Sequence, residues 1–274
     1  MSVKKALFCL TLCKGCDILK TIYPERIFAM NHTNETKTAS TNDFSQMAKN
    51  NVDSKNQLKD AAYVRFHNPE GNGVRIMFVG NSITLHGVAA HIGWNRECGM
   101  AASSLENDYV HILERAVREI DSDAVFCICQ AANWEREYKN GSSTYHHYAA
   151  ARDFDADIII FRCIENCSGV GFDRETFYRE LGAFIDYLNS DREAKIIVTT
   201  GFWRHPGDEQ LRAYARNNSF PLVELGDLGE DDKMKAIGLF DHSGVANHPG
   251  DEGMKNIAER IAKELLPICN TLMQ

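Results

Sequence analysis

Short runs of apolar residues, many of them β-branched, alternate with amphipathic stretches along most of this 274-residue chain. Uninterrupted apolar runs indicate strands that are buried on both faces, as in a parallel sheet covered by helices. A chain of this length can bury one such core as a single domain. The pattern predicts a central, mostly parallel sheet of five strands, at residues 74–79, 124–129, 156–162, 195–200 and 221–224.

The amphipathic stretches between these runs predict the helices that cover the sheet. The string HPGDE occurs twice, at 205–209 and 248–252, and both copies are expected where a helix begins, since acidic residues are favoured in a first turn. Ligands of parallel sheets bind beyond the carboxyl ends of the strands, so the loops that follow the strands are where chemistry is expected. Helices are predicted at 108–120, 172–189, 208–217 and 253–266.

The character of the chain changes near residue 60. Residues 31–60 are rich in Asn, Thr, Ser, Asp and Lys and poor in β-branched apolar residues, which is typical of a loosely packed segment. We therefore expect an N-terminal extension over residues 1–60, flexible or loosely packed, and a folded domain over 61–274. The apolar run at 6–12 is too short to span a membrane and no small-residue cleavage site follows it, so no signal peptide is expected.

Charge and cysteine content restrict the partners and the compartment. Thirty basic and thirty-eight acidic residues give a net charge of −8, which argues against a nucleic-acid partner. The nine cysteines form no even framework of spacings, and Cys127, Cys129 and Cys163 lie in apolar runs, where a thiol behaves as a small hydrophobe. This usage suits a reducing compartment, so we expect a cytoplasmic protein, with secretion as the alternative if the N-terminus acts as a signal. The sequence gives no indication of oligomeric state.

The loop after the first predicted strand reads Gly80-Asn81-Ser82-Ile83-Thr84. Glycine permits a sharp turn and asparagine tolerates positive φ, so the turn can hold the Ser82 hydroxyl at the edge of the sheet. Thr84 stands where a nucleophile elbow of the G-x-S-x-G type requires glycine, and no GK[ST] follows as in a phosphate-binding loop. For this loop alone, a serine that caps a helix is the simpler interpretation.

Two further polar groups fall at loop positions of the same predicted edge. Asn166 follows the third strand, in Glu165-Asn166, and His248-Pro249 lies just before the last helix. A serine hydroxyl becomes an effective nucleophile when a base takes its proton, and the oxyanion that then forms needs preorganised donors. His248 is the expected base, and the Ser82 N–H and the Asn166 amide are expected donors of an oxyanion hole.

Taken together, these segments resemble the sequence blocks of the SGNH/GDSL hydrolases, over roughly residues 74–266. GNSIT resembles the first block, Glu165-Asn166 the block that carries asparagine, and HPGDEGM at 248–254 the last block, usually written DxxHP. The resemblance implies a flavodoxin-like three-layer α/β/α sandwich. It also implies hydrolysis of esters, often of acetyl groups on carbohydrates.

Two departures from the family pattern leave alternatives open. The acid expected three residues before the histidine would fall at Val245. Asp241 is therefore the candidate third catalytic residue, and a backbone carbonyl that orients His248, leaving a Ser–His dyad, is the alternative. The glycine expected after the second strand is absent, so the third oxyanion donor is expected to be the Ala132 N–H, with Gly99 as the other candidate.

Other side chains near this edge have a functional and a structural interpretation. Trp94 and Trp134 are the candidate substrate-binding residues, as stacking surfaces for a sugar, with core or rim packing as the alternative. Arg162 is expected to pair with Glu165 rather than to bind an anion. His205, in the first HPGDE copy, is a less favoured base, because the resemblance places the base before the last helix.

The sequence thus predicts a serine ester hydrolase that forms an acyl-Ser82 intermediate and acts on a small-molecule or carbohydrate ester. This acyl transfer requires no cofactor, so none is expected. No metal ion is expected either, because one CxxC pair and two adjacent histidines form no recognisable zinc ligand set. Two alternatives remain. One is a catalytically weak domain of the same type that binds a glycan or a protein, and the other is a flavodoxin-like binder of a nucleotide or flavin.

Overall fold

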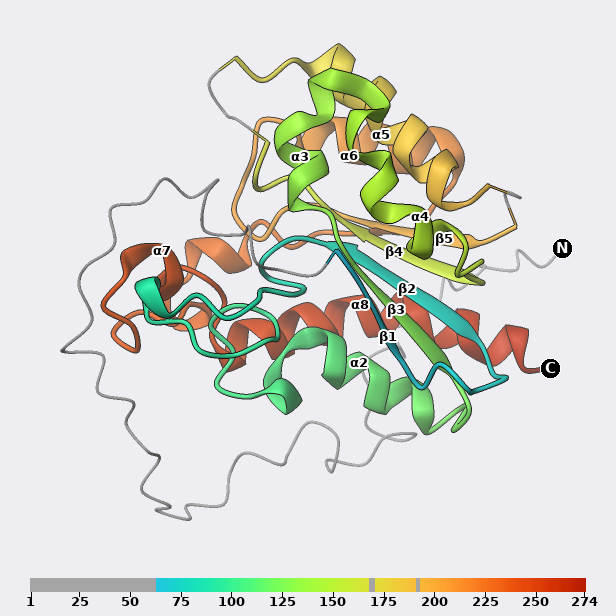
Figure 1. Cartoon of the computed structure of the whole chain (residues 1–274), viewed down its shortest axis with the longest axis horizontal. Helices are drawn as coiled ribbons and strands as arrows, with labels where there is room; N and C mark the ends of the chain where they lie inside the picture. Colours follow the sequence, from blue (N-terminus) through green and yellow to red (C-terminus); the bar gives the residue numbers. More distant parts are fainter. Residues whose placement is uncertain (1–62, 168–170, 191–192) are drawn as a thin grey trace, which may run out of the picture. The chain divides into compact units, whose positions relative to one another are not determined.

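The structure is a computed structural model, and it describes residues 63–167, 171–190 and 193–274. A six-stranded sheet with the order β1-β3-β2-β4-β5-β6 lies between two layers of helices (Figure 1). The expected extension, residues 1–60, lies outside the described residues. The strands are β1 (Val64–His67), β2 (Arg75–Gly80), β3 (Val125–Gln130), β4 (Ile158–Arg162), β5 (Lys195–Thr199) and β6 (Leu222–Val223).

The five strands β2 to β6 are paired in parallel, as predicted. β1 is an additional edge strand, paired antiparallel to β3. The sequence pattern misses it because Val64–His67 is short and only half-buried, with no continuous apolar run. The predicted count of five strands is therefore wrong by one, whereas the mostly parallel α/β architecture is confirmed.

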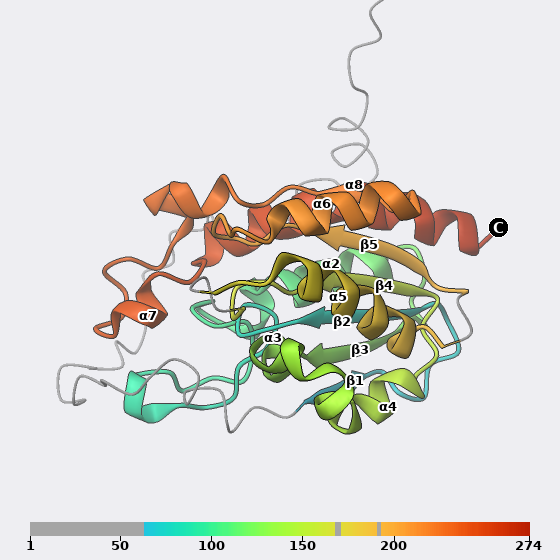
Figure 2. The same cartoon turned by 90° about the horizontal axis from the view of Figure 1, so that it is seen from above.

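Helices cover both faces of the sheet, which gives three layers (Figure 2). One face is covered by α2 and α8, and the other by α3, α4, α5 and α6 (Figures 1 and 2). The short helix α7 lies beyond the carboxyl ends of the parallel strands (Figure 2). The helices are α2 (Tyr109–Arg118), α3 (Ala132–Glu137), α4 (Ala149–Arg152), α5 (Arg174–Leu188), α6 (Asp208–Asn218), α7 (Ser243–Ala246) and α8 (Asp251–Leu272).

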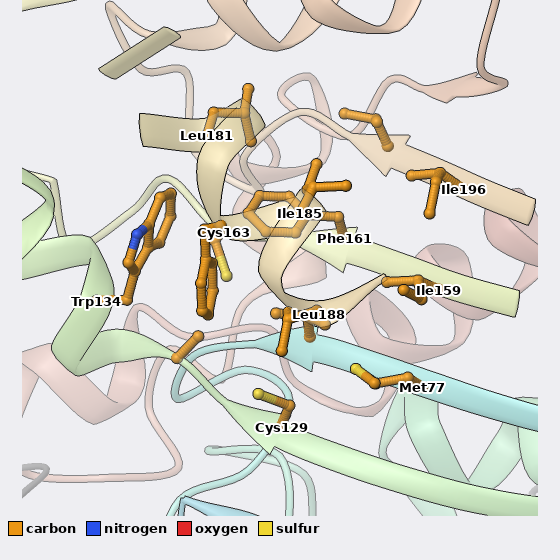
Figure 3. Packing of buried hydrophobic residues seen from close by; sticks show 14 of the residues in the cluster. Met77, Cys129, Trp134, Ile159, Phe161, Cys163, Leu181, Ile185, Leu188 and Ile196 are labelled. Carbon is orange, nitrogen blue, oxygen red and sulfur yellow. The ribbon is translucent and has the colours of Figure 1, made fainter. Parts of the chain in front are cut away.

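Alternation along the strands sends apolar side chains into both layers. Beneath α3 and α5, the cluster shown in Figure 3 joins Met77 and Ile159 of the sheet to Leu181 and Leu188 of α5. Trp134 of α3 stacks on Phe184 in the same cluster, with ring centroids 4.7 Å apart. Burying one such large apolar side chain stabilises the fold by about 1.5–3 kcal/mol.

The opposite layer buries the other side of the same strands. Phe78 of β2 lies against Tyr109 of α2 and Phe126 of β3, with ring centroids 6.2 Å and 6.3 Å away. α2 and α8 also pack against each other on this face. Because both faces are covered, the strands can be apolar throughout, which is the pattern that made them recognisable in the sequence.

The predicted helices are confirmed, with ends that differ by a few residues. Both HPGDE copies lie where a helix begins, α6 at Asp208 and α8 at Asp251, with acidic residues in the first turn.

Cys127, Cys129 and Cys163 are buried and unpaired, as expected for small apolar side chains. Within the described ranges, no helix combines the length and apolar character needed to cross a membrane.

Candidate active site

The loop after β2 holds Ser82 at the carboxyl edge of the sheet. The Asn81 carbonyl oxygen accepts hydrogen bonds from the N–H groups of Thr84 and Leu85, both at 2.9 Å. A Cβ on Gly80 would lie 1.8 Å from Thr84 Oγ1, so glycine is needed here for close approach of the following turn. Asn81 is not among the described non-glycine residues with positive φ. Its contribution is therefore hydrogen bonding and not the unusual φ that the sequence suggested.

The segment 93–104 supports this loop from the outside. The Met100 N–H donates to the Ser82 carbonyl oxygen at 2.8 Å. A Cβ on Gly99 would lie 2.4 Å from the Ile83 carbonyl oxygen, so the two backbones are in close contact. Ala101, at φ 75°, adopts a left-handed conformation that is unfavourable for alanine. The surrounding contacts hold this conformation and fix the backbone of Ser82.

Ser82 and His248 are brought together from opposite ends of the domain sequence. Ser82 Oγ lies 2.8 Å from His248 Nε2, and His248 Nδ1 lies 2.6 Å from the Gly244 carbonyl oxygen. A carbonyl oxygen only accepts, so Nδ1 carries the hydrogen and Nε2 is left to accept the Ser82 hydroxyl proton. This is the arrangement of a nucleophile and its general base.

The Nδ1 partner decides between the two alternatives for orienting His248. The Gly244 carbonyl oxygen, at the start of α7, occupies the position that an acid would take in a triad. Asp241 is exposed, and no hydrogen bond to His248 involves it in the described part of the chain. The structure therefore contradicts Asp241 as the third catalytic residue and favours the dyad, because a backbone carbonyl one helical turn before His248 already satisfies Nδ1.

Burial lowers the pKa of His248 to about 4, from an ordinary value of 6.5. The hydrogen bond to the Gly244 carbonyl opposes this change in the pKa of His248, whereas the electrostatic effect of nearby His86 adds to it. His248 is therefore neutral at neutral pH. A neutral imidazole is the form that can take a proton from Ser82.

A buried hydrogen-bond network lies directly beneath the nucleophile. Glu135, on α3, is completely buried and accepts from Asn81 Nδ2 at 3.0 Å and from Asn166 Nδ2 at 2.6 Å. The two carboxylate oxygens of Glu135 thus fix the position of Asn81, next to Ser82, relative to that of Asn166, the predicted oxyanion donor. A primary amide has two N–H donors, so Asn166 keeps one beyond its bond to Glu135.

The other half of the network contains the predicted ion pair between Arg162 and Glu165. Arg162 Nη1 lies 2.5 Å from Glu165 Oε1, and Arg162 Nη2 donates to Asn81 Oδ1 at 2.5 Å. Glu165 Oε1 also accepts from the Phe202 N–H at 2.9 Å, and Glu165 Oε2 accepts from Asn81 Nδ2 at 2.6 Å. Asn81 therefore joins the loops that follow β2, β3 and β4.

The two buried carboxyl groups of this network differ in proton affinity. Burial, together with the nearby charge of Glu165, raises the pKa of Glu135 to about 7. Burial also acts on Glu165, but the Arg162 charge and several hydrogen bonds outweigh it and hold the pKa of that carboxyl below its usual range. The single guanidinium thus stabilises the charge of Glu165 first, and Glu135 is the group that takes up a proton near neutral pH.

Two of the three expected oxyanion donors keep a suitable environment. Within the described residues, the Ser82 N–H has no hydrogen-bond acceptor, and Asn166 is held by Glu135 as described. Ala132 does not fit: it is buried and its N–H donates to Gln130 Oε1 at 3.2 Å. The alternative, Gly99, donates its N–H to Asp108 Oδ2 at 3.0 Å. The prediction for Ala132 fails because its own neighbouring side chain supplies the acceptor.

The two tryptophans that were expected to bind substrate are buried, and a third tryptophan lies beside His248. Trp94 and Trp134 are both fully buried in the core, so the prediction that they bind substrate is wrong. Trp203, in the loop after β5, is half-buried and lies edge-on to His248, with ring centroids 5.3 Å apart. His205 lies in the same loop, but its Nε2 contacts the Cys167 carbonyl oxygen at 3.0 Å and not Ser82.

Glu135 and Trp203 are the site residues that the sequence did not single out. Each lies within a few residues of the carboxyl end of a strand, and this position was the available signal. The signal is weak for Glu135, because acids are also common in the first turn of exposed helices. Its burial depends on α3 packing against β4 and α5, which the local sequence does not report.

Comparison with known proteins gives structural matches alone. No protein-family model and no curated protein matches the sequence. A two-domain esterase active on acetylated mannans matches with a TM-score of 0.49 and 14% identity, over 74% of this chain and 52% of the other. This chain thus spans about half the length of that two-domain esterase.

Other esterases and lipases match over most of their length. The psychrotrophic esterase EstA from Pseudoalteromonas sp. matches with a TM-score of 0.49 and 12% identity, over 72% of this chain and 98% of the other. A GDSL-like lipase from Bacteroides thetaiotaomicron matches with a TM-score of 0.38 and 14% identity, over 70% and 88% of the two chains. Similarity at this level does not specify an activity, which has to be argued from the site. The chain is similar in structure to esterases and lipases of the GDSL type, the family that its sequence blocks resemble.

Proposed function

We propose that this protein is a serine ester hydrolase in which Ser82 is the nucleophile and His248 the general base. The observation that carries the proposal is the 2.8 Å contact between Ser82 Oγ and His248 Nε2, in a histidine whose other nitrogen is held by the Gly244 carbonyl. The lowered pKa of His248 keeps the imidazole neutral and ready to accept a proton.

The reaction proceeds in two acyl transfers. Ser82 Oγ attacks the ester carbonyl carbon while its proton passes to His248 Nε2, and a tetrahedral oxyanion forms. His248 returns the proton to the leaving alcohol as the ester C–O bond breaks, which leaves an acyl-Ser82. Water then attacks the acyl-enzyme, giving its proton to His248, and collapse of the second intermediate returns that proton to Ser82 and releases the acid.

Stabilisation of the oxyanion is assigned to the Ser82 N–H and to the remaining N–H of Asn166. Both are held in place before substrate arrives, the first by the backbone contacts of the loop and the second by Glu135. Loss of one preorganised donor in sites of this kind costs about 2.7–4 kcal/mol of barrier. No further donor is assigned, because the N–H groups of Ala132 and Gly99 already have acceptors.

Among esters, an acetyl group on a carbohydrate is the substrate class that we propose. Ser82 is only 8% exposed, which supports a small acyl group over a long chain. Trp203 lies beside His248 and is half-buried, and an indole at the edge of a site offers an apolar surface on which a sugar ring can stack.

The proposal is tested by ester hydrolysis with matched serine variants. We expect Ser82→Ala and His248→Ala to lower kcat/KM on p-nitrophenyl acetate by about 10³-fold or more. Ser143→Ala, at an exposed serine, should keep wild-type turnover. An acetylated oligosaccharide and p-nitrophenyl butyrate, compared with the acetate, test the carbohydrate and the chain-length preference.

A fluorophosphonate probe provides a second readout that does not depend on the substrate chosen. The wild type should be labelled at Ser82, and Ser82→Ala should not be labelled. Absence of both labelling and turnover in a folded wild type would reject the hydrolase and favour a glycan- or protein-binding domain. Turnover that survives in Ser82→Ala would reject the assignment of the nucleophile.

A further inference from the structure

A second cluster of reactive side chains lies away from Ser82. His67 is the last residue of β1, and His111 and Glu114 lie on α2. One ligand atom from each of the three lies within 4.8 Å of the others. His67 pairs in register with Phe126, near the amino end of β3, whereas Ser82 follows the carboxyl end of β2. The cluster is therefore separate from the candidate active site.

His111 is oriented by a buried carboxylate. Asp108, which is completely buried and caps the start of α2, accepts from His111 Nδ1 at 2.8 Å through Oδ1. Asp108 Oδ1 also accepts from the backbone N–H of His111 at 2.8 Å, and Asp108 Oδ2 accepts from the backbone N–H of Gly99 at 3.0 Å. Because the hydrogen of the His111 ring is on Nδ1, Nε2 has a free lone pair, and it lies on the side of the ring away from Asp108. A carboxylate behind a histidine in this way is the usual support of a histidine that binds zinc.

His67 and Glu114 complete the set with one nitrogen and one oxygen. His67 Nδ1 lies 2.7 Å from Glu114 Oε1, so a single proton joins the two groups. Zinc bonds of about 2.0–2.2 Å in tetrahedral geometry would place two such ligand atoms about 3.3 Å apart. Replacing the shared proton by an ion therefore requires these side chains to separate by a few tenths of an ångström. Their side chains are 29% and 9% exposed, so the ion can reach them from solvent.

We propose that His67, His111 and Glu114 bind a divalent zinc-type ion, with water as the fourth ligand. Two imidazoles and one carboxylate favour zinc or a similar transition ion, whereas Mg²⁺ and Ca²⁺ prefer oxygen ligands. The negative charges of Glu114 and Asp108 balance a double positive charge. Bound there, the ion joins the edge strand β1 to α2 and stabilises the native state.

The test is metal binding to the full-length chain with Cys9, Cys13 and Cys16 replaced by serine, because thiolates in that segment are strong zinc ligands. After removal of metal with a chelator, Zn²⁺ should bind with 1:1 stoichiometry by calorimetry and raise the Tm by several degrees. Co²⁺ should bind at the same site, and its visible spectrum should show nitrogen and oxygen coordination. A large molar excess of Mg²⁺ should not displace either ion.

Two ligand variants and one matched histidine variant complete the experiment. His111→Gln and Glu114→Gln should each weaken Zn²⁺ binding by about 100-fold or more, since even loss of a supporting partner costs 10–100-fold. His146→Ala removes an exposed histidine outside the cluster and should leave binding unchanged. Melting curves of the metal-free variants show whether each is folded.

Two outcomes would overturn the site. If the folded protein with the three cysteines replaced binds no Zn²⁺, His67–Glu114 is an ordinary hydrogen bond between β1 and α2, and His111–Asp108 an ordinary one at the start of α2. Binding that persists undiminished in folded His111→Gln and Glu114→Gln would place the ion elsewhere. Neither outcome bears on the ester hydrolase, because no residue of the cluster takes part in the proposed reaction.

Discussion

Glu135 accepts hydrogen bonds from Asn81 and Asn166 through its two carboxylate oxygens. Asn81 is also held by Glu165 and Arg162, whereas Glu135 is the partner described for the Asn166 amide. A buried carboxylate is unfavourable unless its hydrogen bonds and charge are compensated. Here two amides supply the hydrogen bonds, and Arg162 lies in the same network. We assign Glu135 as a positioning residue, because it acts on the oxyanion through Asn166 and does not touch the reacting atoms.

Glu135→Gln tests that assignment. The substituted amide keeps one acceptor oxygen but turns an N–H donor towards Asn81 or Asn166, so one of the two bonds is lost. We expect kcat on p-nitrophenyl acetate to fall by about 10–100-fold, with KM changed little, because the lost stabilisation acts on the transition state. Glu137→Gln, at an exposed position of the same helix, is the matched control. An unchanged kcat in a folded Glu135→Gln would remove the positioning role.

At the scale of elements, the site is built from the ends of five separate segments. The loops after β2, β4 and β5 supply Ser82, Asn166 and Trp203, helix α3 after β3 supplies Glu135, and the turn between α7 and α8 supplies His248. The Gly244 carbonyl oxygen of α7 accepts a hydrogen bond from His248 Nδ1 at 2.6 Å, a role that an acidic side chain has in a triad. An acid at the usual family position is therefore unnecessary.

Asp241→Asn separates the dyad from a triad. Because the Nδ1 partner is a backbone carbonyl, the substitution should leave kcat within about twofold of wild type, whereas the same change in a Ser-His-Asp triad lowers kcat by about 10⁴-fold. Asp232→Asn, at another exposed acid, gives the effect of losing one surface charge. Initial rates across a range of pH provide the measurement. A loss of 100-fold or more in Asp241→Asn would restore the triad.

For the whole molecule, the buried site links stability to pH in two opposite directions. The pKa of His248 is lowered to about 4 from 6.5, so its contribution is fully present above 6.5 and is lost as pH falls towards 4. The pKa of Glu135 is raised to about 7 from 4.5, so its contribution is present below 4.5 and is lost as pH rises towards 7. Between pH 4.5 and 6.5 the two effects oppose each other.

Removing either group should reveal the effect of the other on the pH dependence of the free energy of unfolding. Over the step from pH 6.5 to 5, each group changes the free energy of unfolding by about 2 kcal/mol, at 1.36 kcal/mol per pKa unit. Between pH 6.5 and 5, the free energy of unfolding of His248→Gln should therefore fall by about 2 kcal/mol less than that of wild type. That of Glu135→Gln should fall by about 2 kcal/mol more than that of wild type. Urea unfolding at the two pH values measures both differences. Parallel pH dependence in all three proteins would show that neither group carries the shift.

The sequence predicted what depends on local patterns. Uninterrupted apolar runs marked the five parallel strands, because a strand covered on both faces needs no polar positions. Ser82 and Asn166 were singled out because each follows such a run, and the carboxyl ends of parallel strands meet at one edge. His248 was singled out because His248-Pro249 precedes the last helix, as in the last block of the family that the sequence resembles. β1 was missed because an edge strand that is half-buried lacks the continuous apolar signal.

The tertiary structure decided how far each polar group is buried and which partner it meets. Trp134 is a core residue because α3 packs it against β4 and α5, and Trp94 is buried with the segment 93–104. In the sequence, a tryptophan of a binding surface cannot be told from one in a core. The Gly244 carbonyl, and not the Asp241 carboxylate, is the hydrogen-bond partner of His248 Nδ1. The sequence could not single out Gly244, because every residue carries a backbone carbonyl. Hydrogen-bond partners are set by contacts between distant segments, such as Asn81 with Glu135 and Glu165. The residue types and their order thus determined the fold and the candidate pair Ser82 and His248, and long-range packing alone determined the network around this pair.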